Sequence, residues 1–441
     1  MAEPLPSRET SVSRPADGTQ GVFVERRKRP RLVIEPRKPQ PLPTLADYEA
    51  IIDRATLDEI RWLSRRMAGK RIKLINATAL GGSVADALNR TVPLLQELQI
   101  QAQWDVITGG NDFYHVNKAF LGALQGAEYQ LTRQVVDVYL SSLEQNRNRM
   151  DFSSDDIIVV HDIQPVPLVE SRSTQKWIWR CNIDLSKANA DVWGFFRPYV
   201  ERYDAALFSS AAFTRPMGIP EYLFYPSIDP LSEKNKQLDE EFVTKVCEDF
   251  GIDGKRPIVT QISRFERRKD PVGVVQAYKL AKRYVDFQLV LAGGGANEDP
   301  DAALVLDKVL EEAGDDPDII VLNLPPWCAL EVNALQQASD VIVQKSVQEG
   351  FGLTITEALW KGKPVIGSAV GGIPTQIVHK ITGVLVHSIE GCAYQIRYLL
   401  THPDFARQIG QQGREHVKEN FLITTSLKKW LVLCRRLLGE C

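Results

Sequence analysis

SVQEGFGLTITEALWKGKPVIGS, residues 346–368, decides both the fold and the site that we predict for this chain. A Gly-Phe-Gly turn at 350–352 precedes a helical pattern, and the apolar run that follows is typical of a buried strand. Glycine lets the backbone approach a ligand closely, and the free N–H groups of a helix N-terminus suit a phosphate. Glu349 and Glu357 flank the turn, and ionised carboxylates accept strong hydrogen bonds from sugar hydroxyls. The segment therefore predicts a sugar-nucleotide site, with a capped helix and two solvated glutamates as the plainer alternative.

Outward from this segment, apolar runs typical of buried strands alternate with helical patterns along both halves of the chain. Such alternation predicts parallel sheets that are covered on both faces. We expect an α/β fold with two Rossmann-like, doubly wound sheets that face a cleft, because ligands bind outside the carboxyl ends of such strands. The expected strands lie at 71–78, 101–108, 156–162, 176–186, 205–210, 257–265, 285–295, 318–324, 340–346, 364–370 and 382–387.

Composition divides the chain into four parts. The first is rich in Pro and Arg, carries the basic run RRKRPR (26–31), and predicts a flexible extension. The final amphipathic pattern predicts a helix that crosses between the two domains. The predicted parts are the extension 1–44, an N-terminal domain 45–240 that begins with a helix over 45–67, a C-terminal domain 241–413 after a linker within 225–255, and the helix 414–441.

Bulk properties exclude several classes of protein. The formal net charge of −3 gives no overall nucleic-acid signal, and no run of 18 apolar residues predicts a membrane span. The six cysteines are scattered and the histidines have no metal-ligand spacing, so we expect reduced thiols and no bound metal. The N-terminus lacks the apolar core of a signal peptide, and we therefore expect a soluble cytoplasmic protein.

Three further motifs carry charge or glycine at expected strand ends. Gly81, Gly82 and Ser83 open the first helix of the sheet, but no full G-x-G-x-x-G motif supports a nicotinamide cofactor. Arg264 and Lys269, in SRFERRKDP, are placed to neutralise a diphosphate leaving group, although a solvated basic loop is the alternative.

The pair His161-Asp162 ends the strand DIIVVHD. A histidine there can hydrogen-bond a sugar hydroxyl, and a purely structural role is the alternative.

Together these motifs resemble the retaining GT-B glycosyltransferases over about residues 70–420. The stretches HDIQPVPL (161–168), WIWRCNIDLS (177–186), RFERRKDPVGV and the run from Val343 to Pro374 are similar to trehalose synthases of the glycosyltransferring type. Those enzymes join a nucleotide-activated glucose to free glucose to form α,α-trehalose. The resemblance implies that this chain is a hexosyltransferase of carbohydrate metabolism with nucleotide sugar and glucose as its partners, without nucleic acid or membrane. A homodimer is compatible with the sequence.

The resemblance also implies roles for matching positions. Glu349, His161, Arg264 and Lys269 would form the catalytic group, with the two cations on the diphosphate and Glu349 on the glucosyl hydroxyls. Glu357 would bind the ribose, and Asp162, Arg180 and Asn182 would lie at the acceptor. Related sequences carry His after Arg-Cys where this chain has Asn182, which implies a changed acceptor contact. The remaining donor-binding positions are Gly81, Gly82, Ser83, Phe351, Gly352, Leu353 and Thr354.

The implied chemistry needs no tightly bound cofactor. The donor would be UDP-glucose or ADP-glucose, and a Mg²⁺ ion can accompany its diphosphate although the sequence shows no dedicated ligand cage. Retention of configuration would follow from front-face attack, in which the leaving phosphate takes the proton of the acceptor. Trehalose phosphorylase or another disaccharide synthase of the same fold is the enzymatic alternative, and a sugar-nucleotide sensor is the alternative without catalysis.

Overall fold

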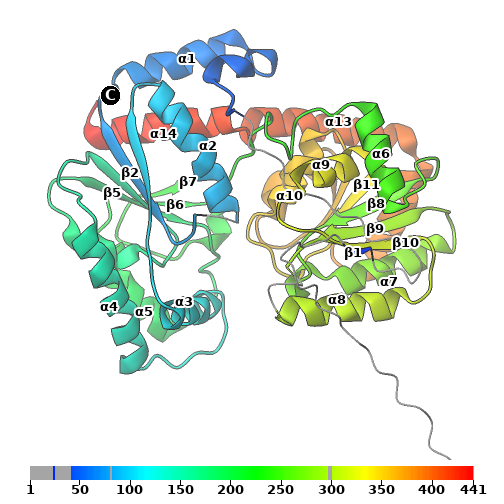
Figure 1. The fold of residues 1–441 in the computed structure, drawn as a ribbon, viewed down its shortest axis with the longest axis horizontal. Helices are drawn as coiled ribbons and strands as arrows, with labels where there is room; N and C mark the ends of the chain where they lie inside the picture. The colour runs from blue at the N-terminus through cyan, green and yellow to red at the C-terminus, as the bar shows by residue number, and fades with distance from the viewer. Residues whose placement is uncertain (1–22, 25–40, 80–81, 296–299, 441) are drawn as a thin grey trace, which may run out of the picture.

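The computed structural model describes residues 23–24, 41–79, 82–295 and 300–440. These residues form two lobes that lie side by side, each with a parallel sheet between helices (Figure 1). The two doubly wound sheets confirm the predicted α/β class.

The N-terminal lobe contains a six-stranded parallel sheet in the order β3-β2-β4-β5-β6-β7. Every residue of β4 is buried, as are five of the six residues of β2, which is the expected pattern for strands covered on both faces. The strands are β2 (Arg71–Asn76), β3 (Gln101–Val106), β4 (Ile157–His161), β5 (Lys176–Cys181), β6 (Ala205–Phe208) and β7 (Glu221–Leu223). The helices are η1 (Leu45–Ala50), α1 (Arg54–Arg65), α2 (Ser83–Glu97), α3 (Asn111–Leu124), α4 (Arg133–Arg149), η2 (Val166–Ser171), α5 (Ala190–Val200) and η3 (Ala211–Phe213).

The C-terminal lobe contains a seven-stranded sheet in the order β1-β10-β9-β8-β11-β12-β13, in which only the edge strand β1 runs antiparallel. Strand β1 comes from the segment predicted to be a flexible extension, so two residues of that segment do pair with the sheet. The strands are β1 (Phe23–Val24), β8 (Ile258–Ile262), β9 (Gln288–Gly293), β10 (Ile319–Asn323), β11 (Val341–Gln344), β12 (Val365–Ser368) and β13 (Val384–Val386). The helices are α6 (Glu240–Phe250), η4 (Arg267–Lys269), α7 (Pro271–Lys282), α8 (Pro300–Ala313), α9 (Ala329–Ala338), α10 (Leu353–Trp360), α11 (Ile373–Gln376), α12 (Ile389–Thr401) and α13 (Pro403–Asn420).

The last helix, α14 (Ile423–Leu438), returns to the N-terminal lobe and packs on α1 and α2 (Figure 1). The sequence pattern predicted one helix over 414–441, and this prediction is wrong because the segment is divided between α13 and α14. Leu422 is extended, with φ −81° and ψ 152°, because it pairs with Ile228 in a parallel bridge between the two connections that join the lobes. Ile228 donates to the carbonyl of Phe421 and accepts from Ile423, each at 2.9 Å.

The connection that leaves β7 is anchored to both lobes. Asp229 pairs with Arg90 of α2 at 2.8 Å and accepts from the Tyr48 hydroxyl at 2.9 Å. Farther along, Asn333 of α9 donates to the carbonyls of Glu233 and Lys236, each at 2.8 Å. The chain therefore changes lobe within a few residues.

Two other predicted elements differ from the structure. The helix expected over 45–67 is divided, because extended Asp53 accepts from the Thr56 backbone N–H at 2.8 Å and starts α1 as its N-cap. The linker expected over 225–255 contains α6, which Gly251 ends in the left-handed conformation with φ 70°. The predicted boundary at 413 falls inside α13.

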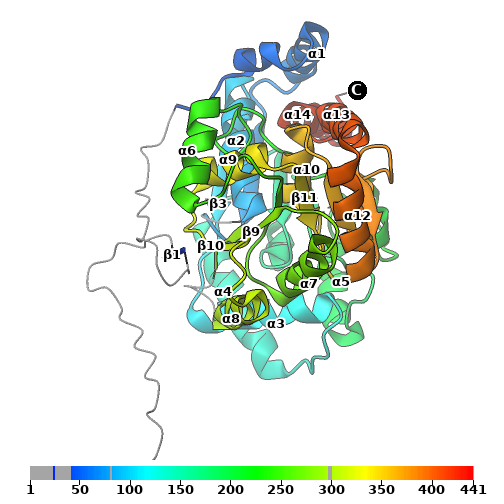
Figure 2. The same ribbon diagram turned by 90° about the vertical axis from the view of Figure 1, so that its right-hand side faces the viewer.

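Strand order places the ligand-binding edge of each sheet. In the N-terminal lobe the order changes direction between β2 and β4, and in the C-terminal lobe it changes direction between β8 and β11. Open α/β sheets bind ligands outside the carboxyl ends of the strands at such a switch point. The turns after these four strands are therefore the expected positions of a ligand site. Figure 2 shows the molecule with the C-terminal lobe facing the viewer.

Candidate active site

Lys269 and Glu349 meet at the switch point of the C-terminal lobe. Lys269 follows β8 and Glu349 follows β11, and the Lys269 Nζ lies 2.7 and 2.6 Å from the two carboxylate oxygens of Glu349. Their side chains are 17% and 6% exposed. The sequence placed both residues at strand ends, and the structure brings them into one charge-assisted pair.

Neighbouring side chains hold this pair in place. Ser346 donates to Glu349 Oε2 at 3.0 Å, and Gln344 donates to the same oxygen at 3.4 Å. Beside it, buried Lys345 pairs with Asp270, whose side chain also caps α7 through the N–H of Gly273 at 3.1 Å. Lys345 and Asp270 were not among the predicted site residues, although Asp270 directly follows Lys269 and Lys345 directly precedes Ser346.

Arg264 lies in the same loop as Lys269 but does not join the pair. Its side chain is 66% exposed, and its guanidinium lies 2.7 Å from Glu266, which also binds Arg268. Glu266 therefore holds two cations of the RFERR motif at the switch point. The mostly exposed guanidinium of Arg264 leaves donors available to an anion.

Helix α10 begins beside Glu349. Its N-cap is Gly352, with φ 84°, and no side chain within the described part of the chain caps the helix. Leu353 and Thr354 form its first turn, so their N–H groups are among those with no acceptor inside the helix. Phe351 is buried and stacks at 6.4 Å on Tyr225 of the connection between lobes.

Glu357 is buried on α10 with charged neighbours from both lobes. Burial raises the pKa of this carboxyl, while the nearby ammonium groups of Lys234 and Lys361 oppose the rise. Lys234 lies in the connection between lobes and pairs at 2.8 Å with Asp86 of α2, which itself raises the pKa of Glu357. Lys361 donates to the carbonyl of Lys234 at 2.7 Å, and burial lowers the pKa of Lys361 to about 7.

These charges predict opposite pH effects for two substitutions. If Glu357 binds the donor as a carboxylate, kcat/KM for the donor should rise with pH through the raised pKa of Glu357. Lys234→Met removes a cation, so it should move this acid limb to higher pH. Asp86→Asn removes an anion and should move the limb to lower pH. Initial rates at subsaturating donor between pH 4.5 and 8 measure both shifts, and shifts of the same sign would contradict this arrangement.

The switch point of the N-terminal lobe presents a second glycine-led helix. Gly82, with φ 87°, is the N-cap of α2, and within the described residues no side chain caps this helix either. Ser83 is the first residue of α2. Gly81, the third predicted residue of this turn, lies outside the residues that the structure describes.

His161 ends β4 with both ring nitrogens unpaired. The side chain is 3% exposed, and neither Nδ1 nor Nε2 has a hydrogen-bond partner among the described residues. Burial, and secondarily the charge of Arg180, holds the pKa of His161 well below its usual value. A neutral imidazole with one free donor and one free acceptor suits a ligand hydroxyl, because buried polar groups are normally paired.

The predicted acceptor residues form a connected group beside His161. Asp162 is in the left-handed region, with φ 61°, and accepts from the backbone N–H and the side-chain amide of Asn182 at 2.9 and 3.0 Å. Burial raises the pKa of Asp162 and lowers that of Arg180 to about 10. The Arg180 guanidinium lies over the ring of Phe224 at 4.9 Å, without an ion pair among the described residues.

The two halves of the site approach each other directly. A Cβ placed on Gly350 of the C-terminal lobe would lie 3.7 Å from the carbonyl oxygen of Asn182 in the N-terminal lobe. The loops after β5 and β11 therefore face one another, with the Lys269–Glu349 pair on one side and the group around Asp162 on the other. Such an arrangement can hold two ligands end to end, one on each lobe.

Two kinds of feature are absent from the described residues. They contain no group of three or more His, Cys, Asp or Glu side chains that could hold a metal ion. No helix among them is both long and apolar enough to cross a membrane.

Comparison with known proteins finds similarity along most of the chain. Residues 74–215 match the family described as trehalose synthase, N-terminal domain, and residues 244–416 match glycosyl transferases group 1. A trehalose synthase of Thermococcus litoralis is 43% identical over 395 residues, which cover 88% of this chain and 96% of the relative. A trehalose phosphorylase of Grifola frondosa is 26% identical and covers 92% of this chain and 64% of the relative.

Solved structures share the two-lobed architecture at low sequence identity. A sucrose-phosphate synthase from Thermosynechococcus elongatus has a TM-score of 0.67 at 18% identity, covering 84% of this chain and all of that one. An E. coli structure described as "Trehalose-6-phosphate from E. coli bound with UDP-2-fluoro glucose" has a TM-score of 0.67 at 13% identity, covering 83% of this chain and 99% of that one. These neighbours confirm the predicted GT-B fold.

Proposed function

This chain is a glycosyltransferase that belongs to the trehalose synthase family, and from this premise we propose its donor, acceptor and stereochemistry. It transfers glucose from a nucleoside-diphosphate glucose to free glucose, with retention of configuration, and releases α,α-trehalose and the nucleoside diphosphate. The reaction takes place in the cytoplasm.

The observation that carries this proposal is the Lys269–Glu349 pair beside the uncapped N-terminus of α10. At this one switch point the Lys269 cation and the Glu349 carboxylate lie beside the free backbone N–H groups of the first turn of α10. The first and last of these suit a diphosphate, whereas the carboxylate suits sugar hydroxyls. An activated sugar carries both kinds of group on adjacent atoms, so one molecule can satisfy the whole arrangement.

The proposed roles follow from position. Lys269, Arg264 and the N–H groups of the first turn of α10 bind the diphosphate, and Glu349 binds the glucosyl hydroxyls. Glu357, buried farther along α10, binds the ribose hydroxyls. The residues of the N-terminal lobe that face this donor bind the reacting sugars: His161 through its free ring nitrogens, and Arg180 with Asp162 at the acceptor.

In the proposed step, the bond between the anomeric carbon and the diphosphate oxygen breaks on the face where the acceptor hydroxyl attacks. The acceptor oxygen forms the new glycosidic bond, its proton passes to the departing diphosphate oxygen, and the configuration is retained. Negative charge grows on the diphosphate during this step, so preorganised cations and N–H donors stabilise the transition state more than the ground state. Contact between the lobes excludes water, which protects the donor from hydrolysis.

A product assay tests this function. The purified protein is incubated with uniformly ¹³C-labelled glucose and UDP-, ADP- or GDP-glucose, and the products are identified by NMR. We expect a disaccharide with label in one ring only and with both anomeric centres α. A β-linked product would contradict the proposed retention of configuration. The absence of any disaccharide with all three donors would contradict the proposed transferase reaction.

Phosphorolysis is the competing reaction because a trehalose phosphorylase is among the similar proteins. A phosphorylase has no ribose to bind, whereas this chain buries Glu357 of α10 among Lys234, Lys361 and Asp86. We therefore favour the nucleotide sugar. Formation of glucose 1-phosphate from trehalose and phosphate, without any product from the three nucleotide sugars, would support phosphorolysis instead.

A further inference from the structure

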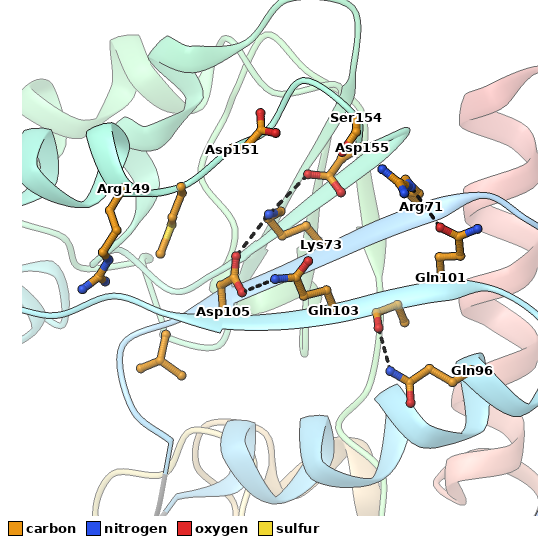
Figure 3. Close-up of a pocket in the computed structure, with 13 residues that line it drawn as sticks. Arg71, Lys73, Gln96, Gln101, Gln103, Asp105, Arg149, Asp151, Ser154 and Asp155 are labelled. Atoms are coloured by element: carbon orange, nitrogen blue, oxygen red, sulfur yellow. Dashed lines mark hydrogen bonds and ion pairs between the residues drawn. The ribbon is translucent and has the colours of Figure 1, made fainter.

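A polar cavity of about 680 Å³ lies on the N-terminal lobe, away from the residues of the candidate active site. Figure 3 shows it between the edge strand β3, its neighbour β2 and the loop after α4. Its lining is mostly polar or charged and includes Arg71, Lys73, Gln103, Asp105, Arg149 and Asp155. The cavity runs along the outer edge of the sheet, from Gln101 at the start of β3 to Val106 at its carboxyl end, and it shares no lining residue with the predicted active site.

The cavity exists because one face of two strands is polar. Gln101, Gln103 and Asp105 alternate along β3 and share a face, while Ala102 between them is buried. The register sets Arg71 opposite Gln101, and Lys73 opposite Gln103. A parallel strand that is covered by helices on both faces carries apolar residues there, so this polar surface is an exception within the sheet.

The floor of the cavity holds a buried charge cluster. Lys73, whose side chain is 6% exposed, lies 3.1 Å from Asp105 and 3.5 Å from Asp155 (Figure 3). The Asp155 side chain is only 7% exposed, and its Oδ2 has no hydrogen bond among the described residues. Burial raises the pKa of Asp155. Its Oδ2 is the oxygen that faces the Lys73 ammonium at 3.5 Å and is itself buried, so this ion pair forms the floor of the cavity and leaves ligand contacts to the more exposed polar groups of the lining.

The charges on the lining cancel. Three cations (Arg71, Lys73, Arg149) stand against three carboxylates (Asp105, Asp151, Asp155), which gives no net attraction for an anion.

The cationic side chains at the two ends of the cavity are already engaged. Arg71 bonds Gln101 at 2.9 Å, and Arg149 bonds Thr108 and Asn146, each at 3.0 Å. The side-chain amides of Gln96 and Gln103 donate to the Ala102 carbonyl and to Asp105, each at 2.8 Å, and their amide oxygens can still accept. Ser154 adds a hydroxyl that can both donate and accept.

We propose that this cavity binds a neutral, hydroxyl-rich ligand of mono- or disaccharide size, as a second sugar site separate from the catalytic one. The volume lies within the range of small-molecule sites, and the dense mixture of donors and acceptors matches hydroxyl groups, each of which donates once and accepts twice. The site requires no turnover, so it stands or falls independently of the proposed reaction.

Saturation-transfer NMR with glucose and with trehalose, in the absence of any donor, tests the proposal. Ser154 is exposed at the cavity, so Ser154→Trp should fill it without disturbing the core. The matched control is Thr244→Trp, at an exposed position on α6 of the other lobe. We expect the wild type and the control to show two classes of sugar site and Ser154→Trp to show one, with kcat and the KM values unchanged within twofold.

A second variant keeps the cavity open. Gln103→Ala should weaken the second class of sites about three- to tenfold, as expected for one neutral hydrogen bond. The proposal is overturned if the titration curves of Ser154→Trp and Thr244→Trp coincide. It is also overturned if inorganic phosphate displaces the sugars from this class of sites, because the cavity would then recognise an anion. Repeating the titration with Lys269→Ala separates the site from catalysis, since loss of turnover should leave sugar binding at the cavity intact.

Discussion

Lys269→Ala is expected to lower kcat by about two to three orders of magnitude, because it removes a cation that we propose to stabilise the leaving diphosphate. Lys269 already binds both oxygens of Glu349 at 2.7 and 2.6 Å, so its ammonium is held at the switch point before any ligand arrives. A preorganised charge stabilises the departing diphosphate without reorganisation during the reaction. Steady-state rates with saturating donor and acceptor measure the effect.

Arg267→Ala is the matched control for Lys269→Ala. Arg267 is an exposed residue of the same basic loop, so its loss tests whether loop charge alone matters. We expect a rate within threefold of the wild type for this variant. Removing one partner of a buried pair can cost about 3–5 kcal/mol of unfolding free energy, so thermal unfolding of both variants is measured first. Lys269→Met, which keeps the length of the side chain, should be as inactive as the alanine variant, and a near-wild-type rate for either would remove Lys269 from the mechanism.

Gly371→Ala is expected to lower kcat/KM at least about 100-fold through the position of Glu349. Gly371 has φ 55°, and a Cβ at this position would overlap the backbone carbonyl of Glu349. The next residue, Gly372, donates to the carbonyl of Gly350 at 2.8 Å, so this turn is in contact with the Glu349 turn. The added methyl group forces the backbone of Glu349 to move. A displacement of about 1 Å in a catalytic group can lower the rate by two orders of magnitude.

Gly362→Ala separates this displacement from backbone strain. Gly362 also has a positive φ, of 69°, but a Cβ there would meet no atom within 4 Å. Each alanine variant should lose about 1–2 kcal/mol of unfolding free energy, because an L-residue is strained in the left-handed region. Only Gly371→Ala should lose activity. Equal kinetic losses in the two variants would show that strain, and not the position of Glu349, is responsible.

The fold was largely predictable because its strands are continuous apolar runs. The run Ile157 to Val160 is buried on both faces, and such runs admit few alternatives to a parallel sheet. The connections between the lobes were harder to predict from the sequence. A helical period continues through Leu422, and only its pairing with Ile228, far away in sequence, forces the extended conformation that divides α13 from α14.

The candidate site shows the same limit of local information. The positions of Lys269 and Glu349 follow from strand ends, yet their direct contact joins residues 80 positions apart and depends on β8 lying beside β11. Lys234 and Asp86 gave no signal in the sequence, because a lysine in a polar linker and an aspartate on a helix are ordinary surface residues. Their importance arises only where the linker passes between α2 and Glu357.

Helix α14 has a consequence for how the polypeptide acquires its structure. Trp430, Leu427 and Leu431 are buried in the cluster that also contains Leu57 and Ile60 of α1, so the first lobe to leave the ribosome is completed by a helix that follows the whole second lobe in the sequence. Nascent domains usually fold in order of their synthesis. Here the earlier lobe keeps an uncovered apolar face until α14 has been synthesised. Removal of α14 should therefore yield an aggregating product, even though every predicted active-site side chain would still be present.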